Sequence, residues 1–84
     1  MTYNDLTPAQ RADLCDAGRR LGIELAAEHV RQGADGGPSE IVGGDFEAVA
    51  DLCARHGIDT PPGYIRHPFW LAVFEGVRAV GSEP

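Results

Sequence analysis

The first part of the chain repeats apolar or small residues every three or four positions, a spacing that places them on one face of a helix. These positions are Leu14, Gly18, Leu21, Leu25 and His29. A helix start precedes them: Thr7 suits the N-cap, Pro8 the first helical position, and Gln10 completes a capping box with Thr7. The pattern stops at Gly33. We therefore predict a helix over about 7–32.

Small residues recur at a spacing of four along this helix, at Gly18, Gly22 and Ala26. An interior glycine costs about 1 kcal/mol of helix propensity relative to alanine, and a helix tolerates that cost where a neighbour approaches closely. Because the apolar phase is unbroken, one continuous helix is favoured over two helices broken at Gly22. The groove predicts contact with another helix. An 84-residue chain has a small core, so a homodimer through this stripe is one way to fill it.

A second helix is predicted over 45–56. Asp45 is a good N-cap, and one face of the helix carries Phe46, Val49, Ala50 and Cys53. Gly57 suits the left-handed position that follows a helix, which would let Ile58 fold back onto the last turn near Cys53.

A third helix is predicted over 68–80, with Pro68 at its first position and His67 held extended before it. Its buried stripe is predicted to consist of Trp70, Val73, Phe74, Val77 and Val80. Glu75 and Arg78 are predicted to face water.

The remaining segments are connections. Residues 33–44 contain five glycines and predict a Gly-rich loop, and residues 81–84 predict a flexible tail. The fold class that follows is all-α, a single small domain of three helices, one long and two short.

The net charge of -6 narrows the classes of partner. It repels a phosphate backbone as a whole and gives no attraction to anionic lipid. No apolar run is long enough to span a membrane. With no apolar leader ahead of them, Cys15 and Cys53 are expected to be free thiols of a cytoplasmic protein. The seven arginines without a lysine are typical of a GC-rich bacterium, such as an actinobacterium, or of its phage.

No enzyme or metal site is indicated. Cys53 and His56 form one loose pair, with Cys15 and His67 elsewhere, whereas zinc sites show two tight ligand pairs. No nucleophile motif such as Gly-x-Ser-x-Gly occurs. We therefore expect a non-enzymatic protein with no cofactor.

The aromatic segment before and within the third helix is the candidate binding surface. Tyr, Trp and Arg are enriched in interface hot spots, and Phe69 is predicted to project about 100° around the helix from Trp70. The predicted partner-binding residues are Tyr64, Arg66, His67, Phe69 and Trp70. The function this predicts is protein–protein interaction with a regulatory role. The alternative is a divergent helix-turn-helix-like DNA-binding regulator, which Pro61, Pro62 and Gly63 disfavour where a recognition helix should begin.

Overall fold

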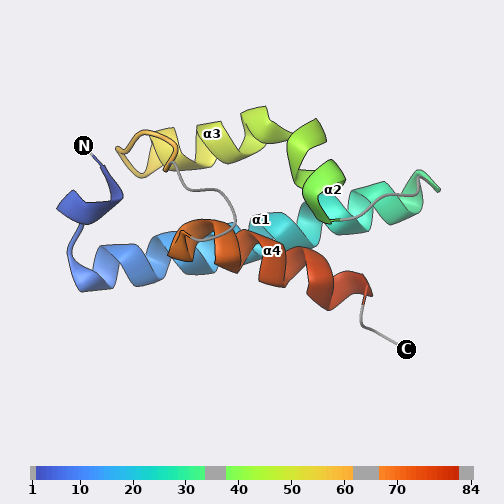
Figure 1. The fold of residues 1–84 in the computed structure, drawn as a ribbon, viewed down its shortest axis with the longest axis horizontal. Coiled ribbons are helices and arrows are strands. Elements are labelled where there is room, and N and C mark those ends of the chain that lie inside the picture. Colours follow the sequence, from blue (N-terminus) through green and yellow to red (C-terminus); the bar gives the residue numbers. More distant parts are fainter. Residues whose placement is uncertain (1, 34–37, 62–66, 82–84) are drawn as a thin grey trace.

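The computed structural model describes residues 2–33, 38–61 and 67–81, and all regular structure in these ranges is helical. A 3₁₀ turn, η1 (Tyr3–Asp5), precedes the long helix α1 (Pro8–Arg31). Two further helices, α2 (Pro38–Gly44) and α3 (Phe46–Arg55), form an arm that runs back along α1 (Figure 1). The last helix, α4 (Pro68–Gly81), lies beside α1 and points in the same direction along the chain.

Helix α1 is continuous through Gly22, as the apolar pattern predicts. Its capping box is present: the backbone N–H of Thr7 donates to Gln10 Oε1 at 2.8 Å, and the N–H of Gln10 donates to Thr7 Oγ1 at 3.2 Å. These two bonds satisfy backbone donors that a helix start otherwise leaves without partners. The prediction of this helix and of its first turn is therefore confirmed.

The α1–α4 contact is built on glycine. Gly18, Gly22 and Ala26 are all buried, and residues of α4 lie directly against Gly18 and Gly22. A methyl group on Gly22 would collide with the Val73 carbonyl oxygen, and one on Gly76 would collide with the Arg19 carbonyl oxygen. The two backbones thus touch at this crossing. The prediction of a close helix contact is confirmed, but its occupant is α4 of the same chain, so a homodimer through this stripe would have to displace α4.

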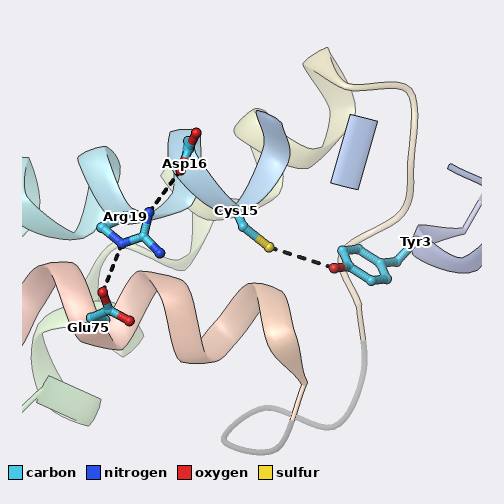
Figure 2. Close-up of polar contacts among 5 residues, drawn as sticks. All are labelled: Tyr3, Cys15, Asp16, Arg19 and Glu75. Atoms are coloured by element: carbon cyan, nitrogen blue, oxygen red, sulfur yellow. Dashed lines mark hydrogen bonds and ion pairs between the residues drawn. The ribbon is translucent and has the colours of Figure 1, made fainter. Parts of the chain in front are cut away.

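An ion-pair network joins the two helices at the surface (Figure 2). The Arg19 guanidinium donates from Nε to Glu75 Oε1 of α4 at 3.0 Å and from an Nη atom to Asp16 Oδ1 of α1 at 2.9 Å. All three side chains are substantially exposed, so solvent screens both ion pairs and each contributes little to stability. The network fixes the relative position of α1 and α4, whereas most of the stability comes from the buried contact.

The predictions of three helices and of a loop over 33–44 both need the same correction, because Pro38–Gly44 forms a further helix, α2. Ile41 and Val42 are buried in the core, and their burial favours a helical turn that the two following glycines argue against. Asp45 stands at the N-cap of α3 as predicted, although its side chain makes no capping hydrogen bond. The predicted tail, 81–84, lies outside the described residues beyond Gly81.

The end of α3 follows the sequence prediction closely. Gly57 has φ 76°, and the Gly57 N–H donates to Ala54 O at 3.0 Å. The Ile58 N–H donates to Cys53 O at 3.1 Å. Together the two bonds form a Schellman motif, and the Ile58 side chain is buried against the last turn.

The hydrophobic core is centred on α4. Five of its side chains are at most 4% exposed: Phe69, Trp70, Val73, Phe74 and Val77. Val80 is half-buried, while Glu75 and Arg78 are exposed, as the helical spacing predicts. Phe46 of α3 remains 46% exposed but stacks on Trp70, with ring centroids 5.9 Å apart. Neither α1 nor any other helix in the described ranges is long and apolar enough to cross a membrane.

Candidate interaction site

Two of the five predicted contact residues belong to the core. Phe69 is fully buried and Trp70 is 1% exposed. The sequence predicts that Phe69 contacts a partner, but its side chain points into the core. Its ring packs against α1 where Gly18 has no side chain, and a Cβ there would lie 2.9 Å from a ring carbon of Phe69. Neither aromatic ring is available to a partner in this fold.

His67 is half-buried and stands directly before α4. Its Nδ1 accepts a hydrogen bond of 3.2 Å from the backbone N–H of Phe69, so the imidazole acts as the N-cap of α4. This bond requires Nδ1 to be unprotonated. Burial lowers the pKa of His67, which favours the neutral ring that the bond needs. The predicted contact residues Tyr64 and Arg66 lie outside the described residues.

Tyr3 of η1 packs against His67. The two rings meet edge to face, with centroids 4.5 Å apart and an interplanar angle of 79°. The Tyr3 hydroxyl lies 3.6 Å from Cys15 Sγ on α1 (Figure 2), and the Arg11 guanidinium lies 5.6 Å from the ring centroid. Burial, with a smaller contribution from the hydrogen bond to Cys15, raises the pKa of Tyr3. These contacts dock the N-terminal turn against the start of α4.

A cleft of about 250 Å³ opens beside this ring pair. Among the described residues, three segments line it, with Thr2, Tyr3, Asn4, Asp59, Thr60, Pro61 and His67. The segment after α3 is anchored on one side by the Schellman turn. On the other side, the buried Trp70 indole N–H donates to the Pro61 carbonyl oxygen at 2.8 Å. The Pro61 end of this wall is therefore held by the core.

The size of the cleft limits what it can bind. Small-molecule sites usually enclose about 300–1,000 Å³, so this cleft falls just below that range and suits one side chain of a partner. Tyr3 and Pro61 contribute apolar groups to this lining, and Asp59 contributes an exposed acidic residue. This combination of an aromatic wall with a few polar groups is typical of a pocket that receives an anchor residue.

The two cysteines lie in different surroundings. Cys15 pairs with the Tyr3 hydroxyl, while Cys53 is buried on α3 with its pKa raised by burial to about 11. Within the described residues, no three histidine, cysteine or carboxylate side chains converge as metal ligands. Both cysteines are free, as expected.

Sequence reasoning missed Tyr3 as a site residue. A signal was present, because Asp5 follows Thr2 at the spacing of a capping box. The Asp5 carboxylate accepts hydrogen bonds from the Thr2 backbone N–H at 2.8 Å and from the Thr2 hydroxyl at 3.1 Å. That spacing predicts an ordered N-terminal turn. The contact between Tyr3 and His67 depends on the fold and has no counterpart in the local sequence.

No family model, no curated protein and no solved structure matches the chain. The site is therefore interpreted from its own geometry and chemistry.

Proposed function

We propose that the chain is a non-enzymatic, cytoplasmic interaction protein that binds a partner protein at the cleft beside Tyr3 and His67. The observation that carries this proposal is a cleft of about 250 Å³, built from three separate segments with an aromatic wall. Its dimensions suit a protruding side chain of a partner, and the groups at its opening can orient that side chain. Through this binding the chain would regulate the partner, and the identity of the partner would decide which process is regulated.

The neighbouring sequence supports the same location. Arg66 directly precedes His67, which lines the cleft, and Tyr64 stands three positions before it. Tyrosine and arginine are among the residue types that dominate interface energetics. The proposed surface therefore keeps three of the five residues predicted from sequence, Tyr64, Arg66 and His67, and adds Tyr3 and Asp59.

The test is affinity capture from the organism's own cells, quantified by mass spectrometry. The variants Asp59→Lys and Arg66→Ala should each lose a partner that the unchanged chain retains, because one places a bulky charge at the cleft and the other removes an anchor candidate. Glu47→Ala, at an exposed position of α3 outside the cleft, should retain the partner. Circular dichroism checks that each variant is folded. Equal capture by all four proteins would refute the proposed surface.

The geometry gives less support to the DNA-binding alternative. In that alternative α4 would be the recognition helix, yet most of its described side chains are buried. The exposed positions after its first residue are Leu71, Glu75, Arg78 and Ala79. This set carries one cation and one anion, whereas a recognition helix needs donors for base edges and cations for phosphates. A salt-dependent mobility shift with duplex DNA would revive this alternative.

A further inference from the structure

A second recess lies between α1 and α3 and shares no lining residue with the cleft. Its volume is about 180 Å³, and its lining consists of Ala17, Arg20, Leu21, Glu24, Leu52 and Arg55. We call it the α1–α3 groove. Leu52 is 8% exposed, and Ala17 and Leu21 are half-buried beside it. The groove therefore has an aliphatic floor that is partly open to solvent.

The charges around this floor differ from those of the rest of the protein. Arg20 of α1 and Arg55 in the last turn of α3 both line the groove, and Glu24 is the one carboxylate among the described lining residues. The lining is thus locally cationic in a chain of net charge -6. Two helices that are adjacent only in the folded chain bring the two guanidinium groups to the same opening.

Arg20 and Arg55 also differ from Arg19 and Arg31 in their ion pairs. Arg19 is bonded to Asp16 and Glu75, and Arg31 is bonded to Glu28. Across residues 2–33, 38–61 and 67–81, neither Arg20 nor Arg55 forms an ion pair, although Glu24 and Asp51 each stand four positions away on the same helix. Their donors remain available to an external oxyanion.

We infer that the α1–α3 groove binds a segment of a partner protein that carries a carboxylate side chain next to an aliphatic one. The aliphatic side chain would cover Leu21 and Leu52, and the carboxylate would accept hydrogen bonds from Arg20 and Arg55. Guanidinium donors match the geometry of a carboxylate and form charge-assisted hydrogen bonds with it.

Charge argues for a short acidic protein segment over a nucleic acid. Electrostatic interactions at a protein surface are screened over about 8 Å at physiological ionic strength. A single carboxylate in the groove is therefore attracted by the two nearby arginines. The successive phosphates of a polymer would extend beyond them over a protein whose net charge is -6, which repels them.

The probe for the test is a blocked eight-residue peptide of alternating leucine and glutamate pairs, titrated into the full chain. The readout is the Nε–Hε signal of each arginine in ¹⁵N NMR spectra, assigned through the variants. Signals of Arg20 and Arg55 should shift, and those of Arg19 and Arg31 should stay in place. A peptide with glutamine for each glutamate should bind more weakly, because the aliphatic contact alone remains.

Three variants sharpen the result without altering buried positions. Arg20→Gln and Arg55→Gln should each weaken the peptide about two- to fivefold, the range expected for an exposed charge pair. Glu24→Gln should tighten binding by up to about the same factor, because it removes the competing carboxylate. These variants leave the cleft intact, so they separate this inference from the proposed function.

The inference would be overturned by equal affinity of the glutamate and glutamine peptides, by the absence of any shift at millimolar peptide, or by unchanged affinity in both arginine variants. Stronger binding of duplex DNA than of the acidic peptide, measured in the same titration, would also overturn it. Each variant is checked by circular dichroism before titration.

Discussion

The two cysteine side chains differ in both accessibility and ionisation. Cys53 is fully buried, and burial raises its pKa to about 11 against a smaller opposing effect of the hydrogen bond with Thr60. Cys15 is half-buried and lies beside the Tyr3 hydroxyl. Because the thiolate is the reactive form, burial and a raised pKa both protect Cys53.

We expect iodoacetamide at about pH 8 to modify Cys15 first and to spare Cys53 until the chain unfolds. Mass spectrometry of the digested protein, with and without guanidinium chloride, measures the two rates separately. A Cys15→Ser variant should show almost no modification in the native state. Equal rates at the two positions in native protein would contradict the burial of Cys53.

At the scale of the helix, the α1–α4 crossing depends on three glycines with different neighbours. At Gly22 and Gly76 an added methyl group meets a backbone carbonyl, which cannot move without displacing a helix. At Gly18 it meets side chains, the Phe69 ring at 2.9 Å and a Val73 methyl at 3.1 Å. Side chains can rotate away, so the same substitution is more tolerable there.

We expect Gly22→Ala and Gly76→Ala each to lower the free energy of unfolding by about 3 kcal/mol or more, and Gly18→Ala by less. Gly43→Ala is the matched control, because this glycine lies in α2 with no atom within 4 Å of the added methyl group. It should stabilise the chain by up to about 1 kcal/mol through helix propensity. Urea unfolding followed by circular dichroism gives all four values. Similar losses at Gly22 and Gly43 would show that the helices do not cross at Gly22.

The start of α4 is sensitive to pH because His67 caps it. Burial lowers the pKa of this imidazole in the folded chain, while the unfolded chain keeps the ordinary value of about 6.5. As the pH falls below about 6.5, the unfolded chain binds a proton more readily than the folded one, so the free energy of unfolding decreases. Tyr3, packed on the same ring, stays neutral in this range, because the ordinary pKa of tyrosine is about 10 and burial raises the pKa of Tyr3 further.

A His67→Asn variant should remove this part of the pH dependence, since asparagine can cap a helix N-terminus and does not titrate. The measurement is the urea midpoint of both proteins from about pH 7.5 to pH 5. The carboxylates and the other histidines are common to both, so the difference between the two curves isolates His67. Parallel curves would mean that the cap does not depend on the charge of His67.

The features that the sequence predicted correctly are those that depend on interactions between residues close together in the chain. The capping box at Thr7, the Schellman turn at Gly57 and the start of α4 at Pro68 each rest on residues within one turn of each other. The helix α2 was missed because burial of Ile41 and Val42 outweighs the low helix propensity of two glycines. The burial of Phe69 and the contact of Tyr3 with His67 join residues far apart in the chain, so helical spacing alone could not reveal them.

At the scale of the whole molecule, α1 and α4 are parallel neighbours, and the arm of α2 and α3 covers the core between them (Figure 1). The small-residue stripe of α1 is filled by α4, and Trp70 links α4 to both Phe46 and Pro61. A second copy cannot use this stripe unless α4 leaves it. The large apolar side chains that remain partly exposed in the described residues, Ile23, Val30, Phe46 and Leu71, are distributed over three helices.

We therefore expect the chain to be a monomer in dilute solution, with no dimer built on Gly18, Gly22 and Ala26. Size-exclusion chromatography with light scattering measures the mass, which is 9.0 kDa for one copy. If a dimer appears, Gly76→Ala distinguishes its origin. A dimer that exchanges α4 between copies keeps the same helix crossing and should be destabilised by this substitution. In a dimer that forms through another surface, Gly76→Ala should destabilise each folded chain but leave the contact between the chains unchanged. Its dissociation constant should therefore not change under conditions in which the chains stay folded.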